Sequence, residues 1–186
     1  MNMRFEGLFS GQMSISFEIV GLKDKIKFYV VCPTKVADLV EKQILGAYPS
    51  AEVLVSSDYN VFPEYGSIEY SELRLDKESH LPIVLSDKLS ADPMNLITGS
   101  LSKVGDGEAL VVQYIISPAN DQWRKIGRGV LKSIEKAQKD PENKSAANLP
   151  QEVVQSISDK INKIGFDTTI RCISVARSKE IAKLNL

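Results

Sequence analysis

Apolar and polar residues alternate from Ser14 to Val20, which predicts a half-buried β-strand. A second alternating run extends from Lys25 to Cys32, and the segment Gly21–Asp24 between the two runs predicts the turn of a hairpin. Further apolar runs predict strands over residues 52–56, 68–75 and 107–116. The last of these is apolar on both faces, which is typical of a central strand.

Between these strands, apolar residues recur at helical spacing in two segments. The first helix is predicted to begin at Thr34 and to end before Pro49, and the second to begin at Asp92 and to end near Gly105. From Lys25 onward the order is β-α-β-β-α-β, the ferredoxin-like order, with one extra N-terminal strand. We therefore expect an α+β domain over residues 13–138, in which two helices cover one face of an antiparallel sheet.

The C-terminal part of the chain predicts additional helices and a change of organisation. A long amphipathic helix is expected from Asn120 to about Lys139, and the polar segment 139–149 is typical of a linker. Residues 150–164 predict another helix, residues 166–176 a strand, and Ser178 the N-cap of a further helix. We expect residues 150–186 to form the start of a second, truncated α/β unit.

The composition is that of an ordinary globular protein, with 43% hydrophobic and 25% charged residues. The net charge of −1 provides no overall attraction for nucleic acid or an anionic membrane. No apolar run approaches the roughly 20 residues of a membrane span, and the N-terminus lacks the pattern of a signal peptide. These features predict a cytoplasmic chain. Any contact with the inner face of the cell membrane would be made by parts of the protein outside this chain. Cys32 and Cys172 are expected to be reduced, buried thiols.

No catalytic or nucleotide-binding motif is found, so we expect no enzyme activity, no cofactor and no metal ligand in this chain. Scattered carboxylates such as Glu18 are expected to be solvated. His80 lies in a polar loop, where a catalytic role is not expected. Gly127 and Gly129 interrupt a helical pattern, which favours close helix packing over a dinucleotide-binding turn.

One charged segment has the spacing of a candidate nucleic-acid site. Arg124, Arg128 and Lys132 are four residues apart, with Lys125 and Lys136 beside them, and residues 121–138 contain five basic and two acidic groups. A basic stripe on a helix can follow a phosphate backbone. The alternative is a solvated helix face opposite an apolar stripe, with long basic side chains covering apolar surface.

A set of residues distributed along the chain resembles a known family. The set comprises Phe28, Tyr29, Pro33, Glu41–Ile44, Tyr48–Ala51, Asp92, Pro93, Gly107, Glu108, Gln113, Pro118, Trp123, Gly165, Phe166, Ile170 and Arg171. Their order and spacing resemble the domain that precedes the motor in bacterial conjugative, type IV secretion-like ATPases of the FtsK/HerA superfamily. The resemblance extends from about residue 17 to the end of the chain.

This resemblance implies a non-catalytic accessory domain that serves assembly or DNA positioning. Its partners would be other protein subunits of a secretion complex, and DNA. The phosphate loop of such an ATPase would follow this domain, so ATP hydrolysis is assigned to no residue here. From the residues alone, a free-standing protein–protein interaction module with a ferredoxin-like core is the alternative.

Overall fold

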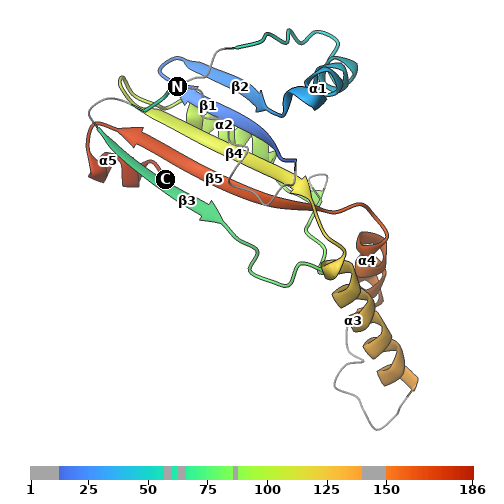
Figure 1. The fold of residues 1–186 in the computed structure, drawn as a ribbon. Coiled ribbons are helices and arrows are strands. Elements are labelled where there is room, and N and C mark those ends of the chain that lie inside the picture. The colour runs from blue at the N-terminus through green and yellow to red at the C-terminus, as the bar shows by residue number, and fades with distance from the viewer. Residues whose placement is uncertain (1–12, 57–59, 63–65, 86–87, 140–149) are drawn as a thin grey trace. The chain divides into compact units, whose positions relative to one another are not determined.

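The computed structural model describes residues 13–56, 60–62, 66–85, 88–139 and 150–186. These residues form the expected α+β fold, with five strands and five helices (Figure 1). In chain order the elements are β1 (Ile15–Leu22), β2 (Lys25–Val31), α1 (Thr34–Ala47), β3 (Ser67–Leu73), α2 (Pro93–Leu101), β4 (Ala109–Pro118), α3 (Gln122–Lys139), α4 (Gln151–Ile161), β5 (Phe166–Ala176) and α5 (Lys179–Leu184).

The five strands form one antiparallel sheet in the order β2-β1-β4-β5-β3. The predicted hairpin of β1 and β2 is confirmed: Phe17 lies opposite Val30 on β2, and opposite Tyr114 on β4. The turn contains Asp24 at φ 58°, a left-handed conformation that Asp tolerates better than most residues. At the other edge, Tyr70 of β3 lies opposite Ile173 of β5.

Strands β3 and β4 run in the same direction and are connected by α2, while β5 lies between them. This is a split β-α-β arrangement, the unit from which ferredoxin-like folds are built. The predicted N-cap of α2 is confirmed, because the Asp92 carboxylate accepts a hydrogen bond from the Met94 amide at 2.9 Å.

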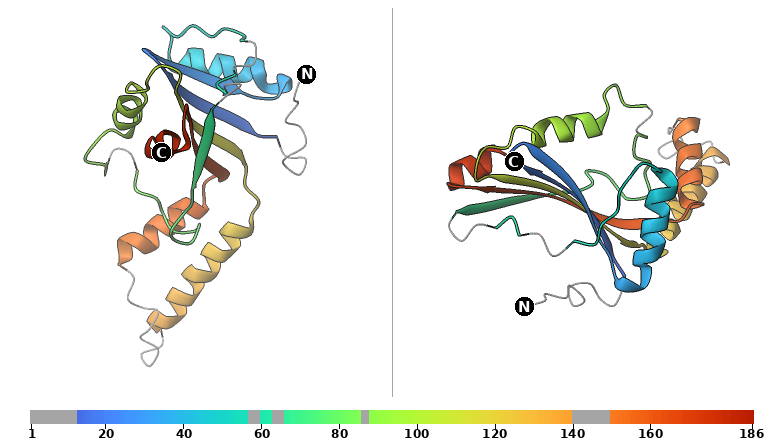
Figure 2. Two further views of the ribbon diagram at one scale, coloured as in Figure 1. Left: turned by 90° about the vertical axis from the view of Figure 1, so that its left-hand side faces the viewer. Right: turned by 90° about the horizontal axis from the view of Figure 1, so that it is seen from above.

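Two expected elements differ in the structure. The strand predicted over residues 52–56 is not formed, and this segment is exposed, with the Leu54 side chain 73% accessible. Its alternating valines had no neighbouring strand to supply hydrogen bonds. Helix α1, which was expected to cover the sheet together with α2, contains no buried residue. Instead, both views of Figure 2 place α2 and α5 on the same face of the sheet.

The strand predicted over residues 166–176 is present as β5, but its place in the fold corrects the prediction. It pairs with β3 and lies beside β4 in the central sheet, so it does not begin a second α/β unit. Of the predicted linker 139–149, Lys139 ends α3, and the other positions lie outside the described residues.

The chain divides into two compact units. One contains the described residues of segments 1–73, 91–117 and 168–186, and its most buried apolar side chains include Val20, Val111 and Val175. In this unit a Cβ on Gly21 would lie 2.8 Å from the Leu101 carbonyl oxygen, so the glycine allows α2 to approach β1 closely.

The second unit contains the described residues of segments 74–90 and 118–167. Its core consists of apolar side chains from α3 and α4, among them Ile134, Ala137, Ile157 and Ile161. These positions recur at helical spacing in the sequence, which is why both helices were predictable. This unit carries the candidate site.

Candidate functional site

Two glycines allow α3 to pack closely within the second unit. A Cβ on Gly127 would lie 2.6 Å from Cγ2 of Ile161 on α4 and 3.3 Å from Cβ of His80. A Cβ on Gly165 would lie 2.5 Å from Cζ2 of Trp123. Separations below about 3 Å are far inside van der Waals contact, so neither position has room for a side chain. The expected close helix packing is therefore confirmed for Gly127, whereas Gly129 has no neighbouring atom within 4 Å of its Cβ position.

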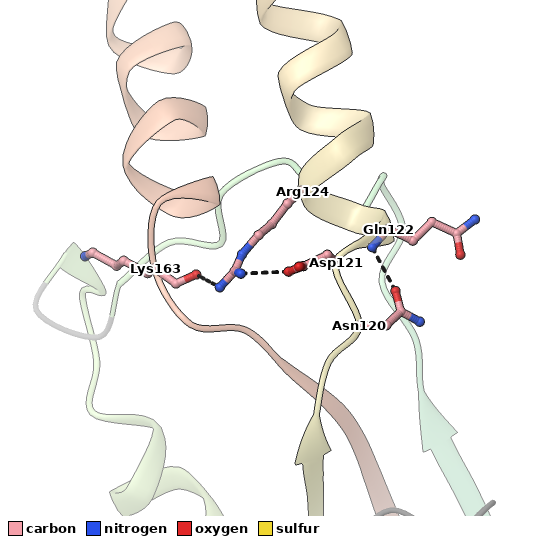
Figure 3. Close-up of polar contacts among 5 residues, drawn as sticks. All are labelled: Asn120, Asp121, Gln122, Arg124 and Lys163. Carbon is pink, nitrogen blue, oxygen red and sulfur yellow. Dashed lines mark hydrogen bonds and ion pairs between the residues drawn. The ribbon is translucent and has the colours of Figure 1, made fainter.

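Arg124 joins the beginning of α3 to the end of α4 (Figure 3). Its Nη1 donates to the Asp121 carboxylate at 2.7 Å, and its Nη2 donates to the Lys163 carbonyl oxygen at 2.5 Å. The side chain is only 23% exposed. Its guanidinium carbon also lies 5.4 Å from the centre of the Trp123 ring. Arg124 was expected to contact nucleic acid, but these contacts give it a positioning role between the two helices, and we remove it from the candidate interface.

The first turn of α3 is held by a second polar contact in the same view. The Gln122 amide donates to the side-chain oxygen of Asn120 at 2.9 Å (Figure 3). This bond satisfies one of the amides that the start of a helix leaves unpaired. The beginning of α3 is therefore fixed both along its own backbone and against α4.

The other cations predicted for this site, Lys125, Arg128 and Lys132, are exposed on α3, and Lys136 is exposed beside them. We call these four residues the basic face. At 100° of rotation per residue they occupy a sector of about 80° on the helix surface. Sequence reasoning had placed Lys136 only at the flank, but its helical position puts it within the same sector.

The two carboxylates near the basic face are engaged by other cations. Asp121 binds Arg124 at 2.7 Å, and Glu135 binds Lys139 at 2.7 Å. The hydrogen bond and the charge of Lys139 lower the pKa of Glu135. Within the described part of the chain, no carboxylate pairs with any member of the basic face. Among the described residues, the face is thus a row of positive charges without carboxylate partners.

A loop from segment 74–90 is bound to the helices by Lys160. The Lys160 ammonium donates to the carbonyl oxygens of Ser79 at 2.7 Å and Leu81 at 2.6 Å. Burial lowers the pKa of Lys160. His80, between these two carbonyls, is only 7% exposed, and its Nδ1 atom is buried without a hydrogen-bond partner. The expectation of an exposed polar loop at His80 is therefore corrected, because this residue is buried and its Cβ lies beside Gly127 of α3.

Comparison with known proteins assigns the chain to a family. Residues 4–184 match a family described as "Domain of unknown function (DUF8128)". The chain belongs to the DUF8128 family. The DUF8128 chain matches no curated protein and no solved structure. Since the family description states no activity, the geometry of α3 and α4 is the main guide to the function of this DUF8128 domain.

The remaining sequence expectations for the DUF8128 domain have mixed outcomes. Cys32 and Cys172 are free thiols as expected, but both are partly exposed. Glu18, expected to be solvated, is only 6% exposed and accepts hydrogen bonds from Ser16 at 2.8 Å and from Gln113 at 3.1 Å.

Two further findings concern metals and membranes in the DUF8128 domain. Among the residues that the structure describes, no three His, Cys, Asp or Glu side chains are grouped as metal ligands would be. Within the same ranges, no helix combines the length and apolar character needed to cross a membrane.

Proposed function

We propose that this chain is a non-catalytic accessory domain of a DNA-translocating ATPase of the type IV secretion or conjugation kind, and that it serves assembly or DNA positioning. The observation that carries the proposal is the basic face of α3, with four exposed cations and no carboxylate partner in the described residues. The sequence resemblance to the domain preceding such motors gives the proposal its biological context.

The physics of phosphate binding fits a surface of this kind. Each cation that neutralises a phosphate releases a condensed counterion, and this release drives association that is strong in low salt and weak in high salt. The chain as a whole has a net charge of −1, so attraction for DNA would be confined to the basic face. We expect moderate, salt-dependent binding that positions DNA, while the motor itself supplies the work.

Charge reversal tests the proposal directly. Binding of a fluorescein-labelled DNA duplex is measured by anisotropy for the native chain, for Arg128→Glu and for Lys35→Glu. Lys35 is an exposed lysine of α1, so it provides the same change of charge at another helix surface. We expect Arg128→Glu to weaken binding and to reduce its salt dependence, with Lys35→Glu close to the native chain. Equal affinities of the two variants would contradict the proposal.

A second candidate function is a free-standing protein–protein interaction module. It is favoured by a different observation: none of the described residues between Leu22 and Ser79 is buried. That stretch includes an edge strand with Phe28 65% exposed and a helix with Leu39 58% exposed. Light scattering and cross-linking distinguish the candidates, because a stable oligomer or a co-purifying protein, without affinity for DNA, would favour the module.

A further inference from the structure

We infer that the partner of the basic face is the phosphate backbone of duplex nucleic acid, bound without reference to base sequence. This inference rests on the proposed function and adds the form of the partner. Three features of the second unit carry it: the arrangement of the four cations, the chemistry of the surface they occupy, and the fixed position of α3.

The cations form a single row whose length suits a run of phosphates. Lys136 lies eleven positions after Lys125, which at 1.5 Å of rise per residue is about 16 Å along the helix axis. The sector of about 80° that they occupy is narrow. A helix bound deep in a groove would need cations on both flanks to reach both strands. A single row instead follows one backbone of the duplex from outside.

On α3 itself, the side that bears this row lacks the aromatic groups that bind single strands. Proteins that bind single-stranded nucleic acid combine a basic groove with aromatic side chains on which bases stack. Trp123 is the one aromatic residue in the sequence of α3, and it packs against Gly165. At 100° per residue it lies about 160° around the helix from Lys125. Exposed bases would therefore find no stacking partner on this helix face.

Three of the four cations are lysines, which act as point charges on flexible stems. Such groups bind phosphate without imposing the planar, two-bond geometry through which arginine reads guanine. Arg128 is the one member that could make such a bond, and it stands in the same external row. We therefore expect the same affinity for duplexes of different sequence.

The row is also held in place before any ligand binds. Gly127 brings α3 into contact with Ile161 of α4, and Arg124 binds the Lys163 carbonyl oxygen. A duplex is a stiff, regular array of charges over this distance. When a fixed row meets a stiff array, little conformational entropy is lost on binding, whereas a flexible single strand must be ordered to fit the same row.

The test compares duplex and single strand on the full chain. A labelled 20-base-pair duplex and each of its strands are titrated by anisotropy at several salt concentrations between about 25 and 200 mM, over which log Kobs should fall linearly with log salt. For four phosphate contacts the slope of log Kobs against log salt is expected to be about −3.6 with the duplex. Binding to either strand is expected to be weaker, and a duplex of unrelated sequence should bind equally well.

Neutral variants assign the binding to the basic face. Arg128→Gln and Lys132→Gln should each reduce the magnitude of the slope by about 0.9, while Lys35→Gln on α1 should leave it unchanged. All three positions are exposed, so thermal melting and far-UV circular dichroism should match the native chain. A variant that lost binding together with its fold would be replaced by Lys136→Gln, which removes one charge from the same row.

The outcomes separate this inference from the proposed function. The duplex inference is overturned if single strands bind as tightly as the duplex and lose the same amount of salt dependence in the variants. That outcome leaves the proposed function in place. Absence of binding to either form overturns both the duplex inference and the DNA-positioning role. Duplex binding that is unchanged in Arg128→Gln and Lys132→Gln also overturns both, because the basic face would not be the contact. Binding to vesicles of anionic lipid, with none to the duplex, overturns the inference in favour of a membrane surface.

Discussion

The packing of α3 on α4 can be tested with two glycines of the same helix. Gly127 and Gly129 are two residues apart, but only Gly127 faces α4. A Cβ added there would lie 2.6 Å from Cγ2 of Ile161, whereas nothing lies within 4 Å of the corresponding position at Gly129. The substitutions Gly127→Ala and Gly129→Ala therefore add the same methyl group in two opposite environments.

The two variants share one energetic term and differ in another. Replacing glycine by alanine inside a helix stabilises it by about 0.8–1.0 kcal/mol, which applies at both positions. At Gly127 the methyl group overlaps a branched side chain whose χ1 is restricted in a helix. Overpacking of this kind costs about 1–3 kcal/mol. Gly129→Ala should therefore be more stable than the native chain by about 1 kcal/mol, and Gly127→Ala should range from about neutral to about 2 kcal/mol less stable.

The assay is equilibrium unfolding in urea, followed by circular dichroism and by Trp123 fluorescence. The informative quantity is the difference in unfolding free energy between the two variants, because the helix-propensity term cancels. We expect this difference to be about 1–3 kcal/mol in favour of Gly129→Ala, or roughly 2–12 °C in melting temperature for a chain of this size. Equal stabilisation by both substitutions would refute the close approach of Gly127 to Ile161.

Three further predictions concern single side chains. Glu18→Ala should lower the unfolding free energy by about 1–3 kcal/mol, because it removes a buried carboxylate and leaves the half-buried Gln113 amide without its acceptor, whereas Glu41→Ala on the exposed face of α1 should change it little. Burial lowers the pKa of Lys160 below the ordinary lysine value of 10.5, so the unfolded chain holds more protons in the pH range between the two values. In that pH range the unfolding free energy should therefore rise with pH in the native chain and not in Lys160→Met. Parallel plots of unfolding free energy against pH for the two chains would contradict the lowered pKa. Burial raises the pKa of the Cys172 thiol, so in Cys32→Ser its alkylation by iodoacetamide at about pH 8 should be slower in the folded chain than in urea, and equal rates would count against that burial.

The sequence predicted the elements whose signals are local. The strand around Phe17, the cap at Asp92 and the apolar stripe of α3 each have signals in neighbouring residues of the chain, and each element is confirmed. The errors concern partners that are distant in sequence. Residues 52–56 have the alternation of a strand, but a strand also needs a partner strand, and this segment is not among the five strands of the sheet.

Strand β5 is a second case in which the pairing of a strand depends on residues distant in sequence. Its sequence identified it as a strand, but α3 and α4 separate it from its neighbour β4, and α2 and β4 lie in addition between it and its other neighbour β3. Nothing in residues 166–176 specifies which strands they join. Glu18 is a comparable case: it alternates with apolar residues as a solvated strand residue would, yet its side chain is buried and accepts a hydrogen bond from the half-buried Gln113 of β4.

The candidate site was predicted in part, and helix geometry explains the remainder. A step of four residues turns a helix by about 40°, so the row that begins at Arg124 turns by about 120° before it reaches Lys136. That rotation places Arg124 on the side of α4, where it binds the Lys163 carbonyl oxygen, and brings Lys136 close to Lys125. A spacing of four residues thus places consecutive cations near one another on the helix. Over three such steps, the first and the last cation lie on different sides of the helix.

Packing and charge are divided between adjacent residues of α3. Gly127 faces Ile161, while Arg128, about 100° further around the helix, faces solvent. Substitution of Gly127 should therefore alter the unfolding free energy, and neutralisation of Arg128 should alter the salt dependence of binding at constant stability. If Arg128→Gln changed both quantities, the basic face would be part of the fold of the second unit, and its charges could not be assigned to a partner.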